Sequence, residues 1–171
     1  MKQYQEIKTG DILLVSSQSW IARQIKRFQR CEWNHAGVFW WAYDKLFIIE
    51  ADKYGICCTP FEDYTSNPTK KLLHLAPTRY IDGSRMGEMM LPYIGHTPYN
   101  YTNLLIAQPI KMITGKWIGR TDERVAKKRM VCSEWCAYVY NKYFGEGVFN
   151  DWYKIAPKDL FNSDFFTKEI L

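Results

Sequence analysis

The sequence predicts an α+β fold with an antiparallel sheet, and three features of the chain lead to this prediction. Short apolar runs rich in β-branched and aromatic residues are concentrated before residue 77. A few turn-forming residues separate several of these runs, a spacing typical of antiparallel hairpins. After residue 85, apolar residues recur at helical spacing. Strands and helices that occupy separate parts of a chain are typical of the α+β class.

The chain is expected to begin with a strand and a helix. Residues 10–15 start with a glycine and continue as a short apolar run, which suits a buried strand. Serines in the segment 16–19 are good N-cap residues. Ile21, Ile25 and Phe28 then follow at helical spacing, so we expect a helix that ends near residue 31.

The next part of the chain predicts an antiparallel meander. Residues 35–41 and 46–51 are apolar runs on either side of 42–45, which predicts a hairpin. Residues 54–60 extend the meander after a turn near Lys53. The run 70–76 has a proline on either side and is a further strand candidate.

Helical patterns dominate the second half. Methionines and a tyrosine repeat at helical spacing over 86–93, and Gly95 is a plausible end. A second apolar segment covers 104–113, where Pro109 is expected to limit or kink a helix.

The strongest helical pattern begins at Cys132. Its apolar face consists of residues at helical spacing (Cys132, Cys136, Val139, Tyr140 and Tyr143), and glycines at 145 and 147 are expected to end it. A last short element is expected to open with Pro157–Leu160.

Length and composition predict one domain over residues 1–171. The chain has 47% hydrophobic and 24% charged residues, which is a globular profile. Because the first residues contain no apolar run of the signal-peptide type, we expect a cytoplasmic location, with export by a non-classical route as the alternative. Five cysteines, an odd number, argue against a disulfide framework in such a compartment.

Cys132 is the main candidate for a nucleophile. It lies at the expected N-terminus of a helix, directly after a basic segment. The helix dipole favours a thiolate there, and the first amides of the helix are free to stabilise an oxyanion. The alternative is an ordinary core cysteine, because Cys132 shares its helix face with apolar residues.

His35 is the natural general base for such a thiol. It opens an expected strand, and its near-neutral pKa allows it to accept and return a proton. Glu50 closes the neighbouring apolar run, where a carboxylate is costly unless it is paired. If the two strands form a hairpin, Glu50 can orient the His35 ring, and Asp52 is the alternative for this role.

A metal centre is the less favoured interpretation of these side chains. Two pairs with a spacing of four, Cys31/His35 and Cys132/Cys136, offer ligands of the zinc type. However, structural zinc sites usually contain tighter C-x-x-C pairs, and about a hundred residues separate these two pairs. We therefore expect no metal and no cofactor.

The net charge of +5 comes from one segment. Residues 111–129 contain seven basic and two acidic residues, and the rest of the chain is neutral. Such a segment is usually a solvated face. Together with the apolar run before it, the region 104–129 also suits a lipid or membrane surface. No nucleic acid is expected, because the chain has no stacking motif.

Taken together, three motifs resemble the circularly permuted branch of the NlpC-type, papain-like cysteine hydrolases, the YiiX-like proteins. They are Gly10-Asp11-Ile12-Leu13, the pair Asn34-His35-Ala36-Gly37-Val38 and Ile49-Glu50-Ala51, and Val131-Cys132-Ser133-Glu134. The resemblance extends from Gly10 to about Leu160. The histidine precedes the cysteine, as in the permuted branch. The aromatic run Phe39-Trp40-Trp41 and the missing signal peptide depart from the family pattern.

The resemblance implies a papain-like fold in which the antiparallel sheet packs against the helix of Cys132. It also implies a Cys132–His35–Glu50 triad, with backbone amides of Cys132 and Ser133 around the oxyanion. We expect a cysteine peptidase or amidase that cleaves a peptidoglycan-type peptide or an acylated amine through a thioester. The alternatives are a lipid-directed acyltransferase or lipase, and a catalytically silent binding protein.

Overall fold

The computed structural model describes residues 4, 6–119, 121–122, 126–145 and 147–171. Within these residues, one sheet contains six strands, β1 (Ile12–Ser16), β2 (His35–Ala42), β3 (Lys45–Asp52), β4 (Gly55–Pro60), β5 (Lys71–Pro77) and β6 (Phe166–Ile170). Their order is β4-β3-β2-β1-β5-β6, and each neighbouring pair is antiparallel. The predicted mixed fold with an antiparallel sheet is therefore confirmed.

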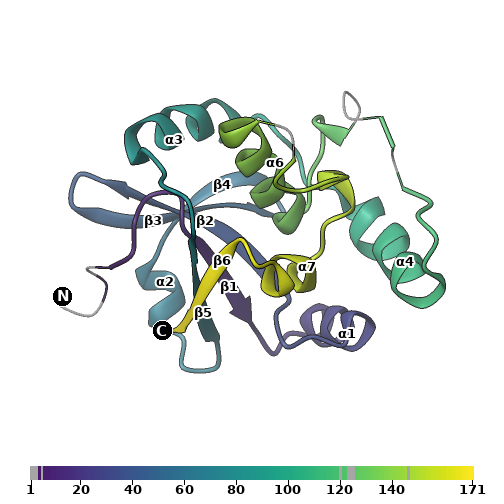
Figure 1. Cartoon of the computed structure of the whole chain (residues 1–171). Coiled ribbons are helices and arrows are strands. Elements are labelled where there is room, and N and C mark those ends of the chain that lie inside the picture. Colours follow the sequence, from purple (N-terminus) through teal and green to yellow (C-terminus); the bar gives the residue numbers. More distant parts are fainter. Residues whose placement is uncertain (1–3, 5, 120, 123–125, 146) are drawn as a thin grey trace.

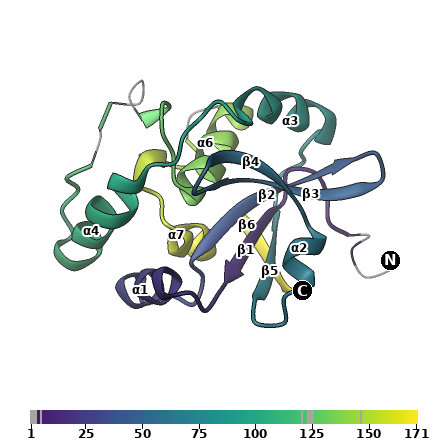
Figure 2. The same cartoon turned by 180° about the vertical axis from the view of Figure 1, so that it is seen from behind.

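The helical elements surround this sheet (Figure 1). They are α1 (Trp20–Gln29), α2 (Glu62–Thr65), α3 (Gly83–Met90), η2 (Leu91–Tyr93), η3 (Asn103–Ala107), α4 (Gln108–Thr114), α6 (Cys132–Phe144), η4 (Trp152–Lys154) and α7 (Pro157–Asn162). Seen from both sides, α1 and α4 lie next to each other at one end of the molecule (Figures 1 and 2). Among the described residues, no helix has the length and apolar character that a membrane span needs.

The predicted hairpin of β2 and β3 is present, and its turn has a clear local cause. Ala42 pairs with Lys45, so only Tyr43 and Asp44 connect the strands. Both residues have positive φ angles, 48° and 61°. Two-residue turns of this left-handed kind match the twist of antiparallel strands.

Capping explains where two helices begin. The Oγ atom of Ser19 accepts a hydrogen bond from the amide of Ala22 at 3.2 Å, which starts α1 as expected. Helix α3 begins at Gly83, earlier than the methionine spacing predicted. The Oδ1 atom of Asp82 accepts bonds from the amides of Ser84 and Arg85, and this cap adds a turn before the apolar positions start.

The apolar segment 104–113 is helical but irregular. A π-helical stretch, η3, covers Asn103–Ala107, and the α-helix α4 follows it with Pro109 in its first turn. A proline has no amide hydrogen to donate to the preceding turn, so the regular α-helical pattern restarts there. The prediction that Pro109 limits the helix is therefore wrong: the helical segment continues to Thr114, and the proline lies where the π-helical stretch changes to an α-helix.

The short helix α2 and the strand β6 were not predicted. Strand β6 is an edge strand that pairs only with β5 among the described strands, and four of its five residues are exposed. Exposed positions on both faces remove the alternation of apolar and polar residues that identifies a strand. Its first residue, Phe166, is buried against Tyr140 of α6, with 5.3 Å between ring centroids.

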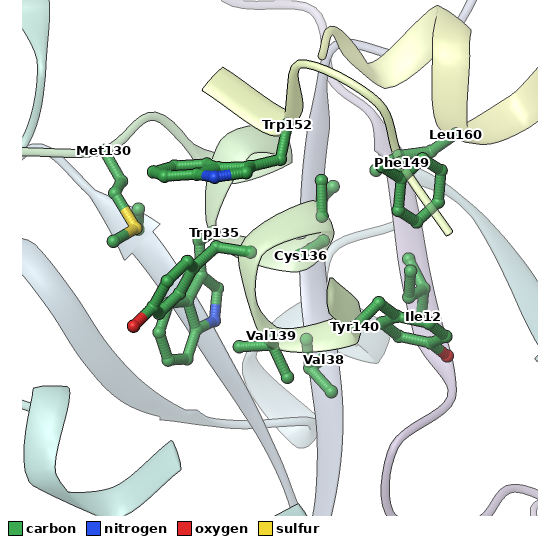
Figure 3. Packing of buried hydrophobic residues seen from close by; sticks show 14 of the residues in the cluster. Ile12, Val38, Met130, Trp135, Cys136, Val139, Tyr140, Phe149, Trp152 and Leu160 are labelled. Atoms are coloured by element: carbon green, nitrogen blue, oxygen red, sulfur yellow. The ribbon is translucent and has the colours of Figure 1, made fainter. Parts of the chain in front are cut away.

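Helix α6 covers one face of the sheet and is the centre of the main core. Figure 3 shows Trp135, Cys136, Val139 and Tyr140 of this helix packed around Val38 and Ile12 of the sheet, beneath further apolar residues. Two hydrogen bonds connect α6 with β3 and with the residues that precede β1. The Nε1 atom of Trp135 donates to the carbonyl of Ile49 at 3.0 Å, and the Tyr140 hydroxyl donates to the carbonyl of Gly10 at 2.5 Å.

The opposite face of the sheet has a smaller core, in which α2 takes part. Phe39 and Ile48 of the hairpin contact Phe61 and Tyr64 there. The sheet is therefore covered on both faces, by α6 on one and by α2 on the other. This arrangement allows side chains from opposite faces to meet at the end of β2.

Candidate active site

Cys132 is the first residue of α6, as the sequence predicted. Only 3% of the residue is exposed. The amides in the first turn of an α-helix have no partner within the helix, so the N-terminus of α6 presents donors close to the sulfur. The same N-terminus carries the positive end of the helix dipole.

Glu134 fixes the start of α6. Its Oε2 atom accepts a hydrogen bond from the amide of Val131 at 3.0 Å, and its Oε1 atom accepts one from the side chain of Asn103 at 2.8 Å. A glutamate at the third helical position that reaches back to the N-cap amide is half of a capping box. The bond to Asn103 joins α6 to η3.

Ser133 is buried, and its hydroxyl donates to the carbonyl of Ile155 at 2.7 Å. The side chain is thus anchored to the segment before α7. This leaves the backbone amide, rather than the hydroxyl, as the group that Ser133 offers near the sulfur.

The hairpin brings Glu50 to His35. In the register of β2 and β3, Gly37 lies directly opposite Glu50, and side chains two positions apart share a face. A Cβ atom at Gly37 would lie 2.3 Å from Cγ2 of Ile48 and 3.1 Å from Cβ of Glu50. Because residue 37 has no side chain, Glu50 can reach along the strand, and its Oε2 atom hydrogen-bonds Nε2 of His35.

His35 also lies close enough to Cys132 for the sulfur's charge and hydrogen-bonding capacity to raise the pKa of the imidazole against the effect of burial. Since Glu50 occupies Nε2, the Nδ1 atom is the ring nitrogen that remains for the sulfur. His35 is the first residue of β2. Its ring at the strand end therefore contacts groups from both faces of the sheet, Glu50 beside α2 and Cys132 at the start of α6.

Tyr64 of α2 is a third partner in this network. Its hydroxyl donates a hydrogen bond to Oε2 of Glu50, the same oxygen that His35 contacts. Thr59 also donates a hydrogen bond to the carboxylate. Glu50 is only 3% exposed, so these bonds compensate for the loss of water around its charge.

The charges in this network reinforce one another. Burial by itself lowers the pKa of His35, but Cys132 and Glu50 outweigh this effect and raise the pKa well above its ordinary value. For Glu50, burial by itself raises the pKa, and His35 together with the hydrogen bonds lowers it below its ordinary value. The site therefore stabilises an imidazolium next to a carboxylate.

Asp52, the alternative orienting acid, has a different partner. Its Oδ1 atom accepts a hydrogen bond from the amide of Tyr54 at 2.7 Å and so closes the turn after β3. It lines the cleft described below, whereas the His35 ring bonds Glu50. The geometry favours Glu50.

A cleft of about 540 Å³ opens at His35. Its walls come from α1, β3, α2, the loop before η3 and η3 itself, and they include Ile21, Ile25, Tyr64, Tyr99 and Leu104. Cys132 is almost fully buried and is not itself a wall residue of this cleft, but it interacts with His35, which is one.

A second hollow, of about 270 Å³, continues from the cleft between α1 and the segment η3–α4. Ile21, Ile25 and Leu104 line both hollows. The remaining lining is mostly apolar and includes Phe28, Leu105, Pro109 and Met112. We call this second hollow the apolar groove.

Tyr64 and Tyr99 also line the cleft, and the sequence did not predict that either of them belongs to the site. Tyr64 lies on a four-residue helix without a periodic signal. Tyr99 forms an isolated bridge with Met130, close in sequence to Cys132. Burial and the nearby charges of Cys132 and Glu134 raise the pKa of Tyr99, so its phenol stays protonated beside the sulfur.

The described residues do not form a metal centre of the usual kind. Among them, no three side chains of His, Cys, Asp or Glu are grouped so that they could hold an ion. The two pairs considered for zinc, Cys31/His35 and Cys132/Cys136, therefore do not combine into a site. His35 is instead shared between Glu50 and Cys132.

Comparisons with known proteins agree with this fold. A family model described as "Permuted papain-like amidase enzyme, YaeF/YiiX, C92 family" matches residues 6–165. The crystal structure of the metalloprotein YiiX from Escherichia coli O157:H7 is similar, with a TM-score of 0.70 and 16% sequence identity. The match covers 95% of this chain and 96% of that one. No curated protein matches the chain.

Proposed function

Because the chain belongs to the family of permuted papain-like amidases, we propose that Cys132, His35 and Glu50 form its catalytic triad. The family makes the protein an enzyme of the cysteine peptidase or amidase type, and a general amide hydrolase. The observation that carries the proposed triad is the position of His35, which bonds Glu50 through Nε2 and faces Cys132 with the other side of its ring.

The proposed reaction has two acyl-transfer steps. The Cys132 thiolate attacks the carbonyl carbon, and the amides of Cys132 and Ser133 stabilise the oxyanion. The C–N bond then breaks, and the imidazolium of His35 donates its proton to the leaving amine. This leaves a thioester on Cys132. His35 next accepts a proton from water, whose oxygen attacks the thioester and releases the carboxylic acid and the thiolate.

The apolar groove favours an acylated amine over a peptidoglycan-type peptide as the substrate. The groove shares three wall residues with the cleft, so an alkyl chain that enters it remains connected to a carbonyl at His35. An apolar lining of this kind gains free energy by removing an alkyl chain from water. A peptide with many polar groups would not gain in this way.

The same groove supports the second candidate, a lipid-directed acyltransferase or lipase. In that case the acyl chain and the thioester are unchanged, and only the bond that is cleaved or the group that accepts the acyl chain differs. An ester substrate releases an alcohol in the first step. In a transferase, an alcohol or amine replaces water in the second.

Covalent capture tests the proposed triad and the substrate together. The protein is incubated with an N-acyl amine of medium chain length, the matching acyl ester and a muropeptide, and intact-mass spectrometry follows the adduct. We expect an added acyl group on Cys132 from the N-acyl amine, and none in the Cys132→Ala variant. An adduct from the muropeptide alone would contradict the substrate class but not the triad. Turnover that persists in Cys132→Ala would contradict the triad.

A further inference from the structure

Exposed apolar side chains are concentrated at one end of the molecule. Three belong to α1 (Trp20, Ile21 and Phe28), and three more belong to η3 and α4 (Leu105, Ile106 and Ile113). Trp20 is 67% exposed, Leu105 58% and Ile113 69%. Among the described residues, the exposed isoleucines and leucines outside 20–28 and 101–118 are Leu91 and Ile170 alone.

These side chains lie around one hollow. Trp20, Ile21, Phe28 and Leu105 all line the apolar groove between α1 and the segment η3–α4. We call these four residues the α1–α4 surface. Both views show the two helices next to each other, away from the tip of the β2–β3 hairpin (Figures 1 and 2). Exposed apolar patches on a soluble domain commonly mark a contact site.

The charged residues of the two segments that form this surface are all basic. Residues 17–31 contain four basic residues and no acidic ones, and residues 101–119 contain two, of which Lys111 pairs with Asp159 of α7 at 3.4 Å. In α1, Arg23 and Arg27 occupy the helix face next to Trp20, while Ile21, Ile25 and Phe28 occupy the opposite flank. An amphipathic helix with a basic face and an exposed tryptophan is typical of binding at a lipid interface.

This charge pattern distinguishes between two possible partners of the surface, a second copy of the chain and a lipid membrane. In a symmetric dimer through the α1–α4 surface, the arginines of both copies would approach each other without acidic partners from these segments. A layer of anionic headgroups would instead neutralise them while its acyl region accepts the apolar residues.

We propose that the α1–α4 surface docks on a membrane surface that contains anionic lipids. The sequence predicted lipid contact through residues 104–129, of which 120 and 123–125 lie outside the described residues, and α1 is the second half of the proposed contact. Ile21 and Ile25 belong both to the groove and to the cleft at His35, so docking would place the mouth of the cleft against the membrane. The proposal goes beyond the hydrolase reaction and does not depend on it.

Vesicle co-sedimentation of the full chain tests the docking. The probes are vesicles of phosphatidylcholine alone and vesicles that also contain phosphatidylglycerol. We expect the unmodified protein to bind the anionic vesicles more tightly, and less so as salt increases. The double variant Trp20→Ser/Leu105→Ser should bind at least about tenfold more weakly, because two apolar anchors are lost. Arg23→Gln/Arg27→Gln should remove the preference for anionic vesicles.

Tyr43→Ser is the matched control. Tyr43 is 99% exposed at the tip of the β2–β3 hairpin, and its replacement should leave vesicle binding unchanged. Circular dichroism melting of every variant shows that the fold persists, and the single variant Trp20→Ser replaces the double variant if that one does not fold. Equal binding to both vesicle types, or equal losses in Tyr43→Ser and Trp20→Ser, would overturn the proposal. A dimer in size-exclusion chromatography that Trp20→Ser converts to a monomer would also overturn it in favour of a second copy.

Discussion

At the scale of residues, the site depends on how Glu50 is held. A buried carboxylate without partners would take up a proton, and its pKa would rise. Glu50 has Tyr64, Thr59 and His35 around it, and its pKa lies below the ordinary value instead. The negative charge is thus kept next to the imidazole, where it helps to raise the pKa of His35.

The Glu50→Gln variant tests this coupling. The amide keeps the shape but removes the charge, so the pKa of His35 should fall. His35 must be protonated to donate to the leaving amine, so the alkaline limb of the kcat/KM profile should move to lower pH. At pH 7.5 we expect kcat/KM to drop by about tenfold or more, the cost of a charged hydrogen bond. The measurement is the pH dependence of amide hydrolysis.

Asp52→Asn is the matched control for that experiment. Asp52 also lines the cleft, but it bonds the amide of Tyr54 rather than His35. The alkaline limb should stay in place in this variant. If the alkaline limb of the kcat/KM profile moved in Asp52→Asn and not in Glu50→Gln, Asp52 rather than Glu50 would be the acid that orients His35.

At the scale of elements, the N-terminus of α6 is held in place by Glu134. The carboxylate joins the amide of Val131 to the side chain of Asn103, and all three groups are buried. It thereby connects the helix of Cys132 with η3, which forms a wall of both the cleft and the groove. A change at Glu134 should affect the sulfur through the helix, without contact with the substrate.

The Glu134→Ala variant should lower the free energy of unfolding by about 2–4 kcal/mol, because two buried donors lose their acceptor. Urea denaturation measures this loss. Glu88→Ala serves as the control, since Glu88 is exposed on α3 and its replacement should change stability little. A loss in Glu134→Ala no larger than that in Glu88→Ala would show that the cap is not needed.

At the scale of the whole molecule, the described residues include two histidine–acid pairs with different surroundings, one partly exposed and one buried. His35 and Glu50 meet at the cleft beside Cys132. Nε2 of His74, in β5, lies 2.6 Å from Oδ2 of Asp11, the residue before β1. Both residues of this second pair are about 95% buried, and no cysteine takes part in it. The second pair therefore lacks the neighbouring thiol that the first pair has.

Local patterns predicted much of this molecule, and long-range contacts account for what they missed. Cys132 at a helix start and His35 at a strand start were identified because the helix and the hairpin each have a strong local signal. Glu50 was identified because a carboxylate that ends an apolar run needs a partner. Tyr64, Tyr99 and β6 were not identified, because each depends on contacts between distant segments, such as the bridge of Tyr99 with Met130.

The rate at which iodoacetamide alkylates Cys132, followed as a function of pH by peptide mass spectrometry, tests whether His35 activates the Cys132 thiol. Burial raises the pKa of Cys57 to about 12 and also raises those of Cys58 and Cys136, so these thiols serve as internal controls. We predict that iodoacetamide alkylates Cys132 faster than these three cysteines at neutral pH, because the His35 imidazolium stabilises a thiolate. In His35→Ala the rate at neutral pH should fall by at least about tenfold. His74→Ala should keep the profile of the unmodified protein, and identical profiles in the unmodified protein and His35→Ala would contradict the account.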